Sequence, residues 1–167
     1  MKLVAFNQLS KAAAQTEFAK CCGASKWVNL LVEKMPFLSM EQLKLAADEC
    51  WKQCNTKDYL EAFSHHPKIG DRSSLEQKFA TTHKWASSEQ SSVKDASATV
   101  IDQLAEANEA YEKKFGYIFI VCATGKSAEE MLKILTSRLA NNPQEEILIA
   151  AAEQNKITHI RINKLLE

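Results

Sequence analysis

The chain has 167 residues, 46% of them hydrophobic, and its 21 lysines and arginines balance 21 aspartates and glutamates. This length predicts one compact domain over residues 1–167, and four glycines with three prolines are too few for a barrel or sandwich of many short strands. A formal net charge of zero argues against a dedicated binder of nucleic acid or of anionic membranes, because both rely on a positive field.

Helix signals follow one another through the first 64 residues. Four serines and threonines mark the starts of expected helices: Ser10, Ser25, Ser39 and Thr56. Gly23 supplies a left-handed stop after the first helix, and the second must end before Pro36, which disfavours helix in the residue ahead of it. Apolar residues recur at helical spacing in each segment, which predicts four amphipathic helices.

The middle of the chain breaks this pattern. A polar loop with proline and glycine runs from His65 to Arg72, and no helical periodicity covers it. Four further capping signals follow: Ser73 with Glu76, Ser87 with Gln90, Ser127 with Glu130, and Asn142 before Pro143. A long amphipathic helix over residues 100–115 stops at Gly116, and the last helix reaches Leu165.

Residues 117–124 differ from the rest because they are apolar and rich in aromatic and β-branched side chains. Such a segment favours a strand, but the sequence offers no second convincing strand to pair with it. We therefore expect a short buried extended segment between helices. The fold class predicted for the chain is all-α, a single-domain helical bundle of about seven to nine helices.

The loop from Ser64 to Asp71 has the character of a functional site. Pro67 pushes the backbone of His66 out of the helical region, and Gly70 permits a chain reversal three residues later. An imidazole held on this elbow can give or take a proton at neutral pH, because its ordinary pKa is near 6.5. The simpler interpretation is that the His-Pro pair ends a helix and exposes its ring.

Three charged residues are further candidates. Glu89 falls in the first turn of an expected helix, where the helix dipole favours an ionised carboxylate that accepts protons or hydrogen bonds. Arg161 lies among apolar neighbours and could clamp a carboxylate or a carbonyl through two parallel bonds, and Arg138 competes for that role. The alternatives are helix capping for Glu89 and structural roles for both arginines.

The five cysteines are odd in number, and Cys21 and Cys22 are adjacent, which suits no ordinary disulfide framework, so all five are expected to be reduced. A zinc site is an alternative, with ligands drawn from Cys50, Cys54, His65, His66 and His83. The first two are four residues apart, which is not the Cys-x-x-Cys spacing, so no metal is expected. Cys122 lies in the most apolar segment, where thiols are usually inert.

No segment has the pattern of a signal peptide or of a membrane span. The first ten residues hold one lysine and no long apolar run, and no stretch approaches the roughly 20 apolar residues of a spanning helix. We expect a cytoplasmic protein.

Several short motifs, taken in order and with their separations, resemble the OHCU decarboxylase family, whose name stands for 2-oxo-4-hydroxy-4-carboxy-5-ureidoimidazoline decarboxylase. They are Trp27, Pro36-Phe37, His66-Pro67-Lys68-Ile69-Gly70, Glu89-Gln90, Asn108-Glu109-Ala110-Tyr111, Lys114-Phe115-Gly116-Tyr117-Ile118-Phe119, Arg138 to Asn141, Glu153, Lys156-Ile157 and Arg161. Each motif is weak alone, but together they span nearly the whole chain, from Phe6 to Leu166.

The resemblance implies an all-helical enzyme of urate breakdown that needs neither a metal nor an organic cofactor and is commonly a homodimer. Its implied substrate is the unstable product of hydroxyisourate hydrolysis, OHCU, and its implied products are (S)-allantoin and carbon dioxide.

Residue by residue, the resemblance implies that His66 and Glu89 are the catalytic pair. The substrate-binding residues that it implies are Pro67, Gln90, Phe119, Ile120, Val121 and Arg161, the three apolar residues of 119–121 acting through their backbone. The chain departs from the family at Lys68, where arginine is frequent, and at Ala86, where serine is frequent. The second change removes one hydroxyl contact to the ureido group, which Ser87 or Ser88 could replace.

Two other functions stay open from the residues alone. A small helical adaptor would hold a partner helix in an apolar groove and would leave the histidine loop as a surface feature. A zinc hydrolase would use the cysteine and histidine set, and chelation would then remove stoichiometric zinc together with activity.

Overall fold

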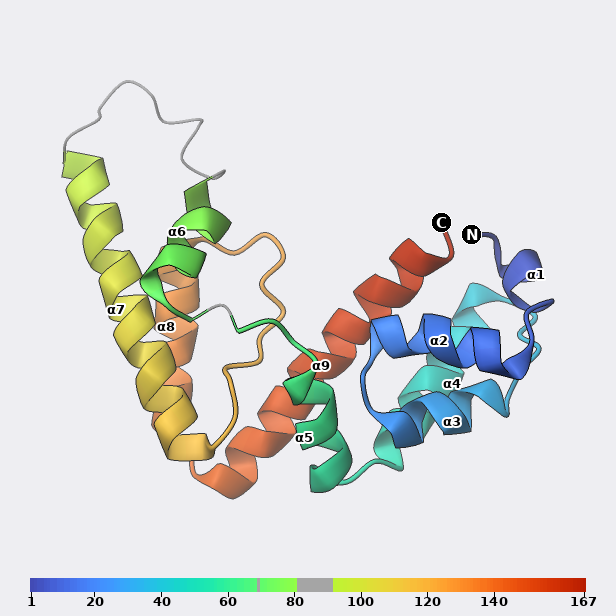
Figure 1. Cartoon of the computed structure of the whole chain (residues 1–167). Helices are drawn as coiled ribbons and strands as arrows, with labels where there is room; N and C mark the ends of the chain where they lie inside the picture. The colour runs from blue at the N-terminus through green and yellow to red at the C-terminus, as the bar shows by residue number, and fades with distance from the viewer. Residues whose placement is uncertain (69, 81–91) are drawn as a thin grey trace. The chain divides into compact units, whose positions relative to one another are not determined.

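The computed structural model of the chain describes residues 1–68, 70–80 and 92–167. Within these ranges it has nine helices and no strand (Figure 1), which confirms the predicted all-α fold. The helices are α1 (Leu3–Phe6), α2 (Lys11–Cys21), α3 (Ser25–Val32), α4 (Met40–Lys52), α5 (Thr56–Ser64), α6 (Arg72–Ala80), α7 (Ser92–Phe115), α8 (Ala128–Leu139) and α9 (Pro143–Leu165). None of these described helices is both long and apolar enough to cross a membrane.

The backbone groups into two compact units. The first unit combines residues 1–66 with 147–167 and so holds α1 to α5 and most of α9. The second unit, residues 67–146, holds α6 to α8 and the first turn of α9. A single domain over residues 1–167 stays a prediction.

The first unit has an aromatic core around Phe18. The ring of Phe18 lies 4.7 Å from that of Phe6, 6.0 Å from Trp27 and 6.4 Å from Phe37, measured between centroids. All four side chains are buried. The last two contacts are edge-on, an arrangement that aromatic quadrupoles favour. This cluster joins α1, α2 and α3 to the chain ahead of α4.

Polar contacts fasten α4 to α9 within the same unit. The indole nitrogen of Trp51 donates to the carbonyl of Ala151 over 3.0 Å. One carboxylate oxygen of Asp48 accepts from Asn155 Nδ2 at 2.7 Å and lies 2.7 Å from His159 Nε2. These contacts hold α9 in register against α4, and α9 carries three side chains of the candidate site, Gln154, Thr158 and Arg161.

Four of the expected helix starts are confirmed by their caps. The hydroxyls of Ser10 and Ser39 accept from the backbone of Ala13 and Gln42, and the side chain of Asn142 accepts from Glu145. Ser127 and Glu130 form the complete capping box that their spacing predicts. These caps satisfy backbone donors that the helix itself leaves unpaired.

Two of the expected caps are wrong by one or two residues. Helix α5 is capped by Asn55, which forms a capping box with Asp58, so Thr56 is instead the first helical residue. Helix α6 begins at Arg72, and Asp71 rather than Ser73 accepts from the backbone nitrogen of Ser74. In both cases an Asn or Asp lies ahead of the expected Thr or Ser. As N-cap residues, Asn and Asp stabilise a helix start at least as well as Ser and Thr do.

Gly23 does not supply a left-handed stop, because among the described glycines only Gly116 and Gly125 have positive φ angles. Helix α2 ends instead on Cys22 in an extended conformation. A Cβ at Gly23 would lie 2.4 Å from Cγ and 2.7 Å from Cβ of His65. Glycine is therefore required here by close approach of the α5 terminus. Gly116, with φ +81°, is the left-handed stop predicted after α7.

Replacing Gly23 by alanine is expected to lower the free energy of unfolding by about 1–3 kcal/mol, because one contact is with a Cβ that cannot rotate away. The same clash pushes on the residue directly before His66. Urea denaturation followed by circular dichroism measures the change, and an unaltered stability would contradict the close approach.

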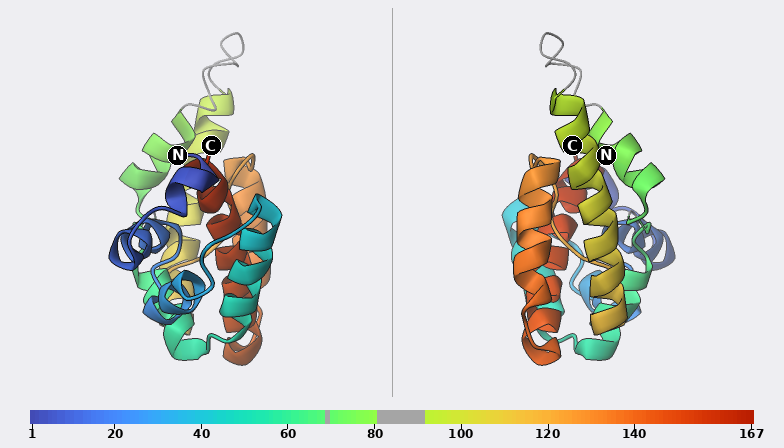
Figure 2. Two further views of the ribbon diagram at one scale, coloured as in Figure 1. Left: turned by 90° about the vertical axis from the view of Figure 1, so that its right-hand side faces the viewer. Right: turned by 90° about the vertical axis from the view of Figure 1, so that its left-hand side faces the viewer.

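In the second unit, α7 and α8 lie side by side (Figures 1 and 2). They run in the same direction because residues 116–127 return along them (Figure 1). The described part of this return has no helix or strand, as expected for an extended segment. Its alternate residues pack against the α7 and α8 core: Tyr117, Phe119, Val121 and Ala123.

Burial of this segment is less complete than predicted. Only Ile120 is buried between residues 117 and 124, and the others are half-buried except Thr124, which is exposed. Ile120 alternates with the residues that pack on α7 and α8, so the side of the segment turned toward those helices is only half-buried.

Candidate active site

His66 lies just beyond α5 in the first unit, where its backbone nitrogen donates to the carbonyl of Phe63 over 3.1 Å. Its ring nitrogen Nε2 lies 2.5 Å from Oε1 of Gln154, a completely buried side chain of α9. Burial lowers the pKa of the half-buried His66 below its ordinary value of 6.5, and the positive charge of Arg161 acts in the same direction. The imidazole is therefore neutral at neutral pH.

Gln154 is anchored in turn by Thr158, one helical turn further along α9. The amide nitrogen of Gln154 donates to Thr158 Oγ1 over 3.2 Å, and that hydroxyl donates to the backbone carbonyl of Gln154 over 3.0 Å. Both side chains are buried, with exposed fractions of 0% and 2%. The partner of His66 is thus held inside the core.

Arg161 extends the same face of α9, seven residues after Gln154. One guanidinium nitrogen donates to the carbonyl of Cys21 over 3.4 Å, and the side chain is half-buried. The first unit therefore brings together His66 and Arg161, which are 95 positions apart in the sequence, and Gln154 of α9 contacts the first of them. An imidazole can exchange a proton with a substrate, and a nearby guanidinium can bind the carboxylate of the same substrate.

The second unit holds a different set of functional candidates around Arg138. Its guanidinium pairs with Glu146 through Nε at 2.8 Å and Nη2 at 2.5 Å, and its Nη1 donates to the carbonyl of Ile120 over 2.7 Å. Glu146 is completely buried and also accepts hydrogen bonds from the hydroxyl of Tyr111 and from Asn141 Nδ2. All three guanidinium nitrogens are occupied, so Arg138 has a structural role here.

This buried pair fixes the backbone over residues 119–121. Besides holding the carbonyl of Ile120, the guanidinium lies 4.6 Å above the ring of Phe119, which packs edge-on against Tyr111 at 5.1 Å. The sequence did not single out Glu146, because a glutamate in the first turn of a helix is ordinary. Its position next to the Arg138 to Asn141 motif is the signal that could have found it.

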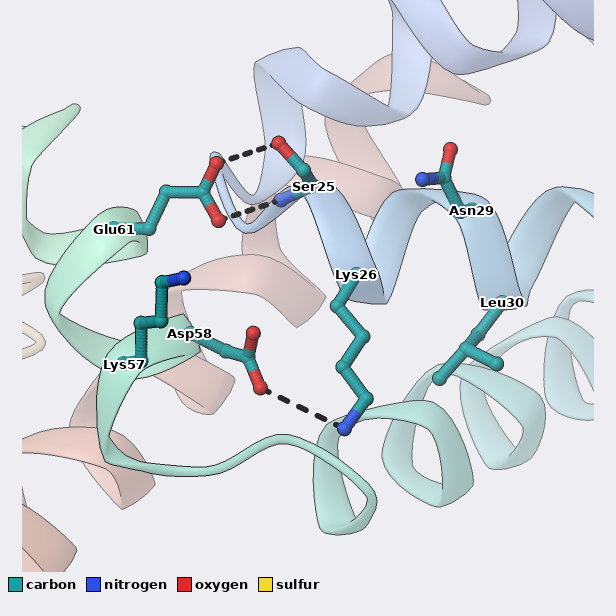
Figure 3. Close-up of a pocket in the computed structure, with 7 residues that line it drawn as sticks. All are labelled: Ser25, Lys26, Asn29, Leu30, Lys57, Asp58 and Glu61. Atoms are coloured by element: carbon teal, nitrogen blue, oxygen red, sulfur yellow. Dashed lines mark hydrogen bonds and ion pairs between the residues drawn. The ribbon is translucent and has the colours of Figure 1, made fainter.

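A pocket of the first unit lies elsewhere. It has a volume of about 610 Å³ and is lined by Ser25, Lys26, Asn29, Leu30, Lys57, Asp58 and Glu61 (Figure 3). The carboxylate of Glu61 accepts from the backbone and the hydroxyl of Ser25 at 3.1 and 2.5 Å, and Lys26 lies 3.7 Å from Asp58. These pairings stabilise the start of α3, and none of the predicted site residues lines the pocket.

Comparison with known proteins gives this arrangement a context. The sequence profile of the family described as OHCU decarboxylase matches residues 7–163. The chain belongs to the OHCU decarboxylase family.

Two similar proteins each match more than three quarters of the chain. The uric acid degradation bifunctional protein TTL of Arabidopsis thaliana is 40% identical over 151 residues, which are 90% of this chain and 47% of that protein. The chain thus spans about half the length of this relative. The 2-oxo-4-hydroxy-4-carboxy-5-ureidoimidazoline decarboxylase of Xenopus laevis is 30% identical, over 78% of this chain and 68% of that protein.

A solved structure supports the same assignment. The crystal structure of an OHCU decarboxylase in the presence of (S)-allantoin superposes with a TM-score of 0.70 at 37% identity, covering 90% of this chain and 96% of that chain. The family resemblance inferred from the sequence motifs is therefore confirmed.

The structure describes part of the residue set that the OHCU decarboxylase resemblance implies. Glu89 and Gln90 lie outside the described residues, as do Ala86, Ser87 and Ser88. Pro67 is exposed at the start of the second unit. Lys68, at the position where arginine is frequent in this family, is also exposed and pairs with Glu112 at 2.7 Å. Its charge therefore points outward.

The cysteines do not have the features of activated thiols or of metal ligands. All five side chains are described and carry free thiols. Burial raises the pKa of Cys21 and Cys22 to about 11 and that of Cys54 to about 12, which disfavours the reactive thiolate. In the described ranges no group of three His, Cys, Asp or Glu side chains could hold a metal ion, and His83 lies outside those ranges.

Proposed function

We propose that this chain decarboxylates OHCU to (S)-allantoin and carbon dioxide. The observation that carries the proposal is the family match over residues 7–163, together with 37% identity to a decarboxylase crystallised in the presence of (S)-allantoin. The neutral, half-buried imidazole of His66 beside Arg161 supplies the residue types that this chemistry needs.

The substrate carries its own electron sink, so the reaction requires no organic cofactor. Its carboxylate is attached to the hydroxyl-bearing ring carbon, next to a carbon-nitrogen double bond. When the bond to the carboxylate breaks, its electron pair forms a carbon-carbon double bond, and the pair of the carbon-nitrogen bond moves to nitrogen, which takes a proton. The resulting enol loses its hydroxyl proton while the ureido-bearing carbon gains one, so each turnover takes up one proton and releases one carbon dioxide.

Two side chains are proposed to handle these protons. His66 acts at the hydroxyl and carboxylate side of the ring, where its neutral form accepts the hydroxyl proton. Glu89 binds the ureido nitrogens as an ionised acceptor, in keeping with its expected place in a first helical turn. Protonation on one face of the ureido-bearing carbon would set the (S) configuration.

The remaining predicted residues bind the substrate. Arg161 pairs with the departing carboxylate, because a guanidinium matches a carboxylate with two parallel hydrogen bonds. Pro67, Gln90 and the backbone of Phe119, Ile120 and Val121 are proposed as the remaining substrate contacts. The anchoring of the Ile120 carbonyl by Arg138 supports a rigid role for this segment.

The proposal includes a cytoplasmic homodimer. Five free thiols suit a reducing compartment. Exposed leucines on the first unit, Leu38, Leu45 and Leu148, offer apolar surface for a second copy, with exposed fractions of 89%, 59% and 61%. Sedimentation velocity measures the oligomeric state, and a monomer at micromolar concentration would contradict the dimer.

The function is tested by generating the unstable substrate in place. Urate, urate oxidase and hydroxyisourate hydrolase are mixed with and without this protein, and optical rotation is followed over time. The proposal predicts faster appearance of one allantoin enantiomer, the (S) form. Equal rates with and without the protein, or a racemic product, would contradict it.

Removing the charge of Arg161 gives a prediction for the pH profile. Because Arg161 lowers the pKa of His66, the variant Arg161→Gln is expected to move the acid limb of kcat/KM to higher pH, toward 6.5, and to raise KM. Activity that requires the neutral imidazole falls as pH drops through the pKa of His66. The control Lys164→Gln removes an exposed positive charge of the same helix and is expected to leave the limb in place. An acid limb at the same pH in both variants would contradict the effect of the Arg161 charge on the pKa of His66.

A further inference from the structure

We propose that Gln154 selects one tautomer of His66, with the hydrogen on Nε2, so that Nδ1 is the nitrogen that exchanges a proton with the substrate. This inference rests on the proposed function, because it takes His66 as the acid-base group. Gln154 is then a positioning residue, which acts on the reaction through the imidazole.

The first support is the short contact between the two side chains. The distance from His66 Nε2 to Gln154 Oε1 is 2.5 Å, and Oε1 is an acceptor that has no proton to give. Nε2 must therefore carry the hydrogen. Nδ1 makes no hydrogen bond with any residue in the described part of the chain, and it is the ring nitrogen left for a substrate.

The second support is the orientation of the Gln154 amide, which the buried Thr158 determines. The single hydroxyl proton of Thr158 goes to the backbone carbonyl of Gln154, so Thr158 Oγ1 is left as an acceptor. Thr158 Oγ1 accepts a hydrogen bond from the amide nitrogen of Gln154, and the amide oxygen of Gln154 therefore faces His66. Reversing the amide would place its oxygen against Thr158 Oγ1, so that two acceptors would face each other in a dry environment, which is costly.

The neutral character of the amide matters for the chemistry. An amide oxygen orients the ring as a carboxylate would, but it stabilises the imidazolium much less. Burial has the largest effect on the pKa of His66 and lowers it, the hydrogen bond with Gln154 raises it, and the nearby charged and titratable groups, Arg161 and His65, both lower it. Together these groups keep the ring neutral and leave the Nδ1 lone pair available.

The tautomer is observed directly by nitrogen NMR of the whole protein labelled with ¹⁵N-histidine, without substrate, at a pH where His66 is neutral. The signal of His66 is assigned by its loss in His66→Asn. The proposal predicts a pyrrole-type shift for Nε2 and a pyridine-type shift for Nδ1. The reverse pair of shifts, or an averaged pair, would overturn it.

Variants separate this role from simple packing. Gln154→Leu is expected to lower kcat about tenfold or more with a smaller change in KM, and to average the two nitrogen shifts, because the ring loses its acceptor. Gln154→Glu keeps an acceptor and is expected to retain the tautomer, but its charge raises the pKa of His66 and moves the acid limb of kcat/KM upward. An unmoved acid limb in Gln154→Glu would overturn the proposal.

Two further variants separate the orientation of the Gln154 amide from the general stability of α9. Thr158→Val removes the hydroxyl that orients the amide and is expected to average the shifts partly, whereas Asn155→Ala removes a neighbouring bond of α9 to Asp48 and is expected to leave the shifts unchanged. Equal spectra for these two variants would overturn the role of Thr158. Wild-type protein that lacks decarboxylase activity but shows the predicted tautomer would refute the proposed function alone.

Discussion

His66→Asn and Glu89→Gln are each expected to lower kcat by about a hundred- to ten-thousand-fold, with the melting temperature of the parent. A positioned acid-base group contributes an effect of this size. Both substitutions keep the approximate shape and hydrogen-bonding capacity of the side chain but remove its ability to carry a proton at neutral pH. Turnover of freshly generated OHCU, followed by optical rotation, measures the loss.

The neighbouring His65 provides the matched control for this prediction. It is an exposed imidazole on the same turn, and His65→Asn is expected to lose far less activity than His66→Asn, because His65 acts on the reaction only by lowering the pKa of His66. Near-parental turnover in both His66→Asn and Glu89→Gln would show that the reaction does not depend on this pair.

Glu146→Leu is expected to lower the free energy of unfolding by about 3–5 kcal/mol. The substitution leaves the buried guanidinium of Arg138 without its carboxylate, and an uncompensated buried charge is costly. At about 2–4 °C per kcal/mol for a chain of this size, the melting temperature falls by roughly 6–20 °C. Thermal denaturation followed by circular dichroism measures the shift.

The pair behaves as a unit, so a second substitution is expected to relieve the first. Arg138→Met combined with Glu146→Leu removes both charges and is expected to be more stable than Glu146→Leu alone. Glu33→Leu breaks the exposed pair with Lys11 and is expected to cost no more than about 1 kcal/mol. Equal losses for Glu146→Leu and Glu33→Leu would contradict the importance of burial.

Local signals were sufficient for much of the fold. The capping box of Ser127 with Glu130 and the start of α9 at Asn142 and Pro143 depend on neighbouring residues only, and both are confirmed. The stop at Gly116 is equally local, since only its own φ angle is involved. Gly23 was misinterpreted because the reason for that glycine is the ring of His65, which lies 42 positions further along the chain.

The residue types of the candidate site could be predicted from the sequence, but the contacts that these residues make could not. The elbow at His66 and Pro67 was visible as a break in periodicity, but its contact with Gln154 joins residues 88 positions apart. A polar stripe at Gln154, Thr158 and Arg161, spaced four and three residues apart on a helix, is the signal that could have indicated it. Sequence reasoning left Arg138 open as a substrate clamp, because only coordinates reveal that Glu146 and Ile120 occupy its guanidinium.

The central claim is that the imidazole of His66, the carboxylate of Glu89 and the guanidinium of Arg161 surround one molecule of substrate. A crystal structure of the protein with bound (S)-allantoin measures this most directly. The predicted result is a product ring within hydrogen-bond distance of all three side chains, with Nδ1 of His66 facing it. Allantoin bound elsewhere, or any of the three side chains on an opposite flank of the molecule, would contradict the claim.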